Sequence, residues 1–208
     1  MRRVALVTLL AVIPSACVSV STFQLPEPVD RGKTVLGVGA TTMLSDGAVG
    51  LIPELYGRYG IAHDWDIGLK FVGFPPVGFF QADVKRLLVD GDYKLAADLG
   101  ISRVGGEVTV TTTSGDGDTE EYKSDWGFTA LYPALIVGKG SFHGGVKAII
   151  IGAGTSEDDF ITDNVVGLFA GTRLGGRVQW VPEVHVYFGA GGTLVTGGLG
   201  VQFPLGGN

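Results

Sequence analysis

The chain has 208 residues, of which 45% are hydrophobic, 17% are charged and 35 are glycine, and its formal net charge is −6. The charged fraction lies below the roughly 25% that is usual in soluble domains. Beyond residue 16 no stretch of about 18 consecutive apolar residues exists, which excludes a helical crossing of a membrane. An acidic balance without a basic cluster gives nucleic-acid binding no support.

Residues 1–16 have the form of a secretory signal peptide, because Arg2 and Arg3 precede an apolar run from Val4 to Ile13. The segment from Ile13 to Cys17 resembles the bacterial lipobox, although Pro14 stands where leucine is usual. The resemblance implies cleavage before Cys17 and lipid attachment to it. Val18 replaces the aspartate that would signal retention in the inner membrane, so the resemblance implies the outer membrane. An uncleaved or conventionally cleaved leader is the alternative.

Residues 17–33 are polar and contain Pro26 and Pro28. This composition predicts a short tether on the periplasmic side, anchored by the lipid on Cys17. The remaining residues, 34–208, form the predicted folded domain.

From Thr34 onward, short segments alternate apolar with small, polar or charged residues, which is the pattern of strands with two different faces. Leu55 and Tyr59 alternate with Glu54, Tyr56 and Arg58, for example. Strands can cross a bilayer only as a closed barrel, so the pattern predicts a closed antiparallel up-and-down transmembrane β-barrel of ten strands, with eight as the alternative. The expected strands are Thr34 to Met43, Gly50 to Ile61, Asp66 to Val72, Gly78 to Leu88, Tyr93 to Val104, Trp126 to Gly138, Phe142 to Gly152, Val165 to Gly175, Gln179 to Gly189, and Leu194 to Phe203.

Short connections alternate with long acidic ones. Turns near His63-Asp64, Val89 to Asp92, Lys139 to Ser141 and Gly176 to Val178 are expected on the periplasmic side, and an even strand count places both termini there. The segments Gly105 to Asp125 and Ala153 to Asn164 are expected to be extracellular loops. Aromatic residues near strand ends suit an interfacial girdle, namely Tyr59, Trp65, Tyr93, Trp126, Tyr132 and Trp180.

Charged residues at the predicted inward positions are nearly balanced in sign. In a narrow barrel such groups pair with one another and fill the lumen, whereas a thin polar channel is the alternative. The predicted lumen network comprises Glu54, Arg58, Asp66, Lys70, Asp83, Lys85, Lys94, Asp98, Lys147, Arg173, Glu183 and His185, with Gln81, Thr129 and Tyr187 beside them.

The run from Tyr56 to Leu69, the lipobox-like leader and the glycine-rich last strand resemble small bacterial outer-membrane β-barrel proteins, including uncharacterised lipoproteins. The resemblance implies the cell outer membrane of a Gram-negative bacterium, with outer-membrane lipid and the barrel-assembly machinery as partners. Such barrels often end on an aromatic residue that this machinery reads, whereas here Phe203 is followed by Pro204-Leu205-Gly206-Gly207-Asn208.

These features predict a structural or surface-interaction role through the extracellular loops. The alternatives are a small pore or transporter for a polar or amphipathic solute, and a soluble lipocalin-like barrel with its apolar residues inward. No catalytic residues, metal site or cofactor are predicted. His185 and Glu183 are expected to be part of the lumen network, and the acids Asp116, Asp118, Glu120 and Glu121 lack the spacing of an EF-hand loop.

Overall fold

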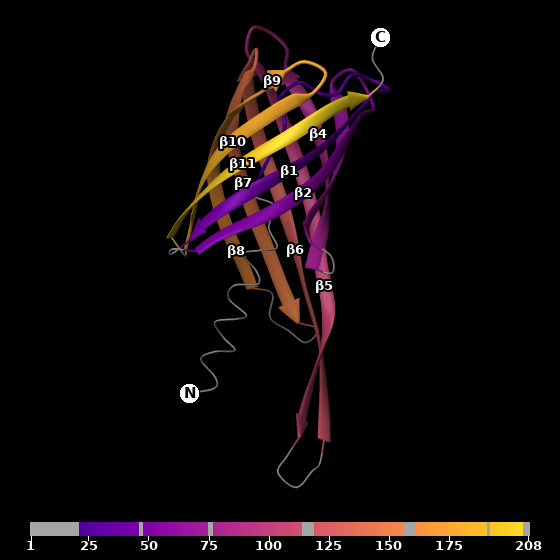
Figure 1. Ribbon diagram of the computed structural model, residues 1–208, viewed down its shortest axis with the longest axis vertical. Coiled ribbons are helices and arrows are strands. Elements are labelled where there is room, and N and C mark those ends of the chain that lie inside the picture. The colour runs from indigo at the N-terminus through magenta and orange to yellow at the C-terminus, as the bar shows by residue number, and fades with distance from the viewer. Residues whose placement is uncertain are drawn as a thin grey trace.

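The computed structural model describes residues 21–45, 48–74, 77–113, 119–155, 161–190 and 192–205. Within these ranges the chain forms one antiparallel sheet (Figure 1), and no helix is long and apolar enough to span a bilayer. The strands are β1 (Thr34–Ser45), β2 (Ala48–Gly60), β3 (Trp65–Phe74), β4 (Val77–Val89), β5 (Lys94–Thr113), β6 (Thr119–Lys139), β7 (Phe142–Thr155), β8 (Ile161–Thr172), β9 (Leu174–Gly175), β10 (Gln179–Gly189) and β11 (Gly192–Leu205).

The sheet closes on itself. Sequential strands pair from β1 to β8, β8 pairs with β10, and β11 pairs with both β10 and β1. The closing register joins Thr34 to Leu205, and β11 meets β10 at Gln202 and Gln179. Because β9 is a two-residue piece paired only with β10, the closed wall contains ten strands. The prediction of a ten-strand up-and-down barrel is confirmed, and the eight-strand alternative is wrong.

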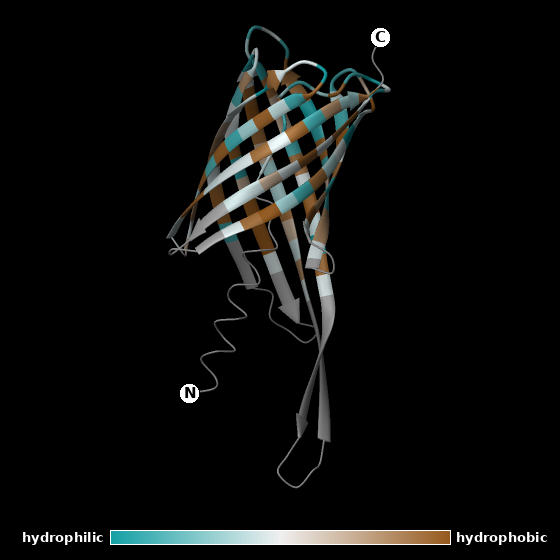
Figure 2. Cartoon of the chain, viewed as in Figure 1, coloured by the Kyte–Doolittle hydropathy of each residue, from teal (hydrophilic) through white to brown (hydrophobic). Residues whose placement is uncertain are grey.

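Alternation places apolar side chains outside and polar ones inside. In β2, Leu55 and Tyr59 are exposed whereas Glu54 and Arg58 are buried, and Figure 2 shows the same alternation along the other strands. Leu69, Leu99 and Ile101 are about half exposed, at 55%, 52% and 49%. A lipocalin-like barrel would hold these residues inside, so the lipocalin-like alternative is wrong. An apolar wall around a polar interior is the arrangement of a membrane-spanning barrel.

The two ends of the barrel differ. One end, here called the short-turn end, holds the connections 61–64, 90–93, 140–141 and 173–178 together with the start of β1 and the end of β11. At the opposite end, here called the hairpin end, β5 and β6 continue pairing as far as Thr113 and Thr119 and project beyond their neighbours (Figure 1).

Two long loops, 105–125 and 153–164, were predicted at this end, and the predicted lengths are wrong. Most of 105–125 is hairpin, and β7 and β8 likewise extend to Thr155 and from Ile161. The polar composition indicated loops, but the β-branched run Val108-Thr109-Val110-Thr111-Thr112-Thr113 favours strand over coil.

Residues 21–29, here called the plug segment, lie inside the barrel. Ser21 to Pro26 are all buried, and Phe23 packs against Tyr56 and Val181. The sequence predicted a periplasmic tether for 17–33, whereas residues 21–29 lie inside the barrel, where their backbone and Phe23 find hydrogen bonds and packing. Near the short-turn end the chain leaves the lumen, and Gly32 donates from its amide to the Gly60 carbonyl at 2.8 Å.

The aromatic girdle is present at the short-turn end. Tyr59, Tyr93 and Trp180 are exposed there, Arg86 lies over the Trp65 ring, and Lys139 over the Tyr93 ring. Tyr132 was predicted to join them but is buried in the lumen, where its hydroxyl contacts Ser102 Oγ at 2.8 Å. The side chain of Trp126 lies outside the described residues.

Candidate functional site

One group of charges joins β2, β3 and β4 inside the barrel. Arg58 contacts Asp66 through its Nη2 and Asp83 through its Nη1, the latter at 2.6 Å. Lys85 Nζ lies 3.3 Å from the second oxygen of Asp66. All four side chains are almost completely buried. Buried charges persist only when they are paired and hydrogen-bonded, and these pairs meet that condition across adjacent strands.

A second group lies near the middle of the lumen. Lys70 Nζ is 2.9 Å from Glu54 Oε2, and Thr41 donates to the other Glu54 oxygen at 2.8 Å. Ser21 of the plug segment also donates to Glu54 through its hydroxyl. Lys70 in turn donates to the Ser21 hydroxyl and to its main-chain carbonyl. Wall and plug segment therefore share one network of hydrogen bonds.

The third group centres on Glu183 of β10. His143 Nε2 and His185 Nε2 each lie about 3 Å from one of its oxygens, at 2.9 and 3.0 Å. The amide of Thr22 donates to the same carboxylate at 3.0 Å. His185 also stacks between the rings of Phe169 and Tyr187. These contacts hold both imidazoles in fixed orientations and bind the plug segment to the wall.

Side chains of the lumen bind the plug segment mainly through hydrogen bonds to the main chain of that segment. Carbonyl oxygens of the segment accept from Lys70, Lys85, Lys147 and Gln202, and two of its amides donate to Glu183 and Asp66. The extended segment cannot form these bonds by itself, and buried backbone groups must be paired. The polar lumen residues thus supply the partners that a sheet or helix would otherwise provide.

Phe23 occupies a space left by glycines. A Cβ built at Gly39 would lie 2.6 Å from the Phe23 ring, and one at Gly198 would lie 2.8 Å from it. Tyr56 stacks on Phe23 with ring centroids 5.8 Å apart. Inward-facing glycines of β1 and β11 therefore make room for the Phe23 ring of the plug segment.

The structure places most of the predicted lumen residues in the barrel interior. Asp98, Lys147, Gln81 and Tyr187 are buried in the interior like the members of the three groups. Three of the predicted residues, Lys94, Arg173 and Thr129, lie outside this buried network.

Lys94 pairs with Asp90 at the exposed short-turn end, 2.8 Å away, because it begins β5. Arg173 follows the end of β8 and is only partly buried. Thr129 is on the outer face, since Phe128 and Ala130 beside it are the buried residues of β6. Cys17 lies outside the described residues.

The sequence analysis missed the plug segment and His143. One signal was available, because the inward positions of β1 and β11 carry Gly37, Gly39, Gly198 and Gly200. Four missing side chains in one part of a narrow lumen leave a space that something else must fill. His143 is the second residue of β7, and a position at a strand end gave no indication that its ring reaches Glu183.

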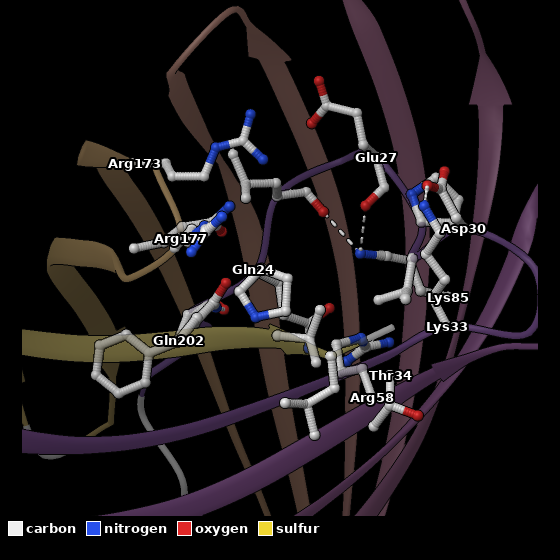
Figure 3. Close-up of a pocket in the computed structure, with 18 of the residues that line it drawn as sticks. Gln24, Glu27, Asp30, Lys33, Thr34, Arg58, Lys85, Arg173, Arg177 and Gln202 are labelled. Carbon is white, nitrogen blue, oxygen red and sulfur yellow. Dashed lines mark hydrogen bonds and ion pairs between the residues drawn. The ribbon is translucent and has the colours of Figure 1, made fainter. Parts of the chain in front are cut away.

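A cavity of about 860 Å³ lies between the plug segment and the wall at the short-turn end (Figure 3). Its lining includes Gln24 and Glu27 of the plug segment, Lys33 before β1, Gln202 of β11, and Arg173 and Arg177 beside β9. Among the described residues, no group of three His, Cys, Asp or Glu side chains could hold a metal ion.

No protein-family model matches the chain, and no curated protein matches it. Similar solved structures include the NanC porin, with 11% identity over 81% of this chain and 98% of that one and a TM-score of 0.45. The translocator domain of the autotransporter NalP from Neisseria meningitidis is 9% identical over 97% of this chain and 95% of that one, with a TM-score of 0.42. The attachment invasion locus protein Ail of Yersinia pestis is 11% identical over 83% and 97%, with a TM-score of 0.39. Likenesses at these levels carry no information about function.

Proposed function

We propose that the protein is an outer-membrane β-barrel whose lumen is closed by its own plug segment and whose role is structural or surface-interacting. One observation carries the proposal: seven hydrogen bonds join lumen side chains to the main chain of residues 21–29. A segment bound in this way fills the interior instead of leaving a path for solutes. Contact with other molecules then falls to the ends of the barrel.

The hairpin end is the proposed contact surface. The paired extension of β5 and β6 reaches beyond the rest of the wall (Figure 1), and long extracellular connections with short periplasmic ones are usual in such barrels. An epitope inserted between Thr113 and Thr119 should be detected on intact cells. The same epitope inserted between Gly140 and Ser141 should be detected only after the outer membrane is permeabilised. The reverse pattern would contradict the proposed orientation.

The second candidate, a small pore for a polar or amphipathic solute, has less support. The charges in the lumen are of both signs and are paired, whereas a selective pore is usually lined by one dominant sign. Planar-bilayer recording of the purified full-length protein decides between the two. No steady current is expected from a closed barrel, and a reproducible unit conductance would favour the pore.

We propose no catalytic role. A nucleophile or a general base has to reach a substrate, and His185 is buried beneath the plug segment with Glu183 shared between it and His143. Assays of the full-length protein against peptide and phospholipid substrates should show no turnover above that of a His185→Gln variant.

Lipid attachment at Cys17 is proposed from the leader sequence. Ser21 is buried in the lumen, and the four residue steps from Cys17 to Ser21 extend at most about 14 Å. A lipid on Cys17 therefore has to lie close to a barrel opening. Labelled palmitate should be incorporated into the full-length protein and lost in Cys17→Ser, and incorporation that survives this substitution would contradict the proposed site.

A further inference from the structure

The cavity at the short-turn end has two arginines on one side. The main-chain amide of Arg173 donates to the Ser141 carbonyl at 2.8 Å, which fixes the backbone at this position. Arg177 lies in the turn between β9 and β10, two residues after Gly175, which ends β9 with a φ of 96° that residues with side chains rarely adopt. Figure 3 shows both guanidinium groups on the same side of the cavity. Within the described ranges, neither of them forms an ion pair, although both line the cavity.

The plug segment contributes two hydrogen-bond acceptors without donors to the same cavity, one from Glu27 and one from Gln24. Glu27 lies in Figure 3 between the arginines on one side and Asp30 and Lys33 on the other, and its Oε2 is buried without a hydrogen-bond donor. Gln24 is 6% exposed, lines the same cavity, and its Oε1 also has no donor.

Asp30 differs from Glu27 in having a partner. Lys33 donates to it at 2.9 Å and holds the pKa of Asp30 below its usual value. Glu27 is therefore the acid of this cavity with no cation within bonding distance among the described residues.

Buried acceptors without a donor are costly unless something binds them. Arg177 is exposed and Arg173 is partly exposed, so both guanidinium groups are available to an anionic group that enters the cavity. Here the two kinds line a single cavity, whose volume is in the range of small-molecule sites. A ligand that satisfies both must carry an anionic group and a cationic donor at some distance from each other. A simple anion would leave Glu27 and Gln24 unpaired, and a simple cation would leave the arginines unpaired.

We propose that this cavity binds a small zwitterion, an amino acid or a short peptide, with its carboxylate on Arg173 and Arg177 and its ammonium group on Glu27 and Gln24. Arginine suits the carboxylate because its planar donors match two oxygens at once. The site requires the plug segment as one of its walls, since Gln24 and Glu27 belong to it. It does not depend on the role proposed for the hairpin end.

The test uses the full-length protein in detergent and isothermal titration with three peptides. Tri-alanine carries both charges, N-acetyl-tri-alanine lacks the ammonium group, and tri-alanine amide lacks the carboxylate. Tri-alanine should bind at least about tenfold more tightly than either blocked peptide, because each loses a charge-assisted hydrogen bond. Absence of tri-alanine binding, or equal binding of all three peptides, would overturn the proposal.

Variants assign each end of the peptide. In Arg173→Gln/Arg177→Gln, tri-alanine should bind no better than its amide, and in Glu27→Gln it should bind no better than the acetylated form. Arg86→Gln and Asp64→Asn change the same charges in an exposed pair outside the cavity and should keep the full discrimination. Loss of discrimination in these controls would contradict the assigned site.

Heat-modifiable migration on a denaturing gel checks that each variant is folded. The recordings and epitope experiments on the barrel as a whole are independent of peptide binding, so failure of one proposal is distinguishable from failure of the other.

Discussion

Lys85 donates from its Nζ to the main-chain carbonyl of Leu25 at 2.7 Å, inside the barrel. The same ammonium group donates to the Glu27 carbonyl and lies 3.3 Å from Asp66. One side chain of β4 therefore connects the plug segment to the charged group on β2 and β3. Because these bonds are buried, the plug segment and the wall are expected to unfold together.

Replacing Lys85 with methionine tests this coupling. Lys85→Met keeps most of the side-chain length, but it leaves the Leu25 and Glu27 carbonyls without this donor and removes the positive charge beside Asp66. Loss of one partner of a buried pair should lower the free energy of unfolding by about 3 kcal/mol. Urea titration in lipid vesicles, followed by tryptophan fluorescence, measures the change. Lys33→Met removes the exposed pair with Asp30 and should leave the midpoint almost unchanged; equal effects of the two would contradict the buried linkage.

The space around Phe23 predicts that substitutions of Phe23 and Gly39 are energetically coupled. Gly39→Ala places a methyl group 2.6 Å from the Phe23 ring and should cost about 1–3 kcal/mol through overpacking. In the Phe23→Ala background the same change should cost much less, because the clash is gone. A double-mutant cycle from unfolding midpoints measures the coupling. Gly50→Ala, where no atom lies within 4 Å, is the control, and a coupling near zero would mean that Phe23 does not occupy this space.

Glu183 connects the two histidines to the plug segment. Glu183→Gln preserves the shape but removes the charge that accepts these bonds, so the free energy of unfolding should fall by about 2 kcal/mol. Chemical unfolding under the same conditions gives the value. Asp64→Asn, in an exposed pair with Arg86, is the matched control because surface pairs contribute little. If both variants unfold at the wild-type midpoint, Glu183 does not hold the plug segment.

The wall of the barrel could be predicted because each strand has to present one face to lipid and the other to the lumen. In β10 the expected and observed bounds agree, Gln179 to Gly189, since apolar residues occupy every outward position there and most inward positions are polar, Val181 being the exception. In β6 the pattern failed. Ala130 and Tyr132 face the lumen, while Leu131 and Leu135 face outward, so both faces are apolar or small and Thr129 was assigned to the wrong one.

The plug segment could not be predicted from local pattern. Its contacts join residues far apart in sequence, such as Phe23 and Gln202, and most of them use the main chain, which is the same in every sequence. The candidate site at the short-turn end was missed for a related reason. Arg173 was assigned to the network in the wall, but the cavity that it lines exists only because Gln24 and Glu27 lie inside the barrel.

The lipid-facing wall gives the last prediction. Leu99 is exposed on the outside of β5, well away from both of its ends, whereas Leu88 is exposed next to the end of β4. Arginine at the middle of the bilayer costs about 2–4 kcal/mol and near the interface about 0–1 kcal/mol. Leu99→Arg should therefore lower the free energy of unfolding in lipid vesicles much more than Leu88→Arg. Equal losses in vesicles would place Leu99 outside the hydrocarbon region, and equal stability of the two variants is expected only in detergent micelles, which adapt to a charged side chain.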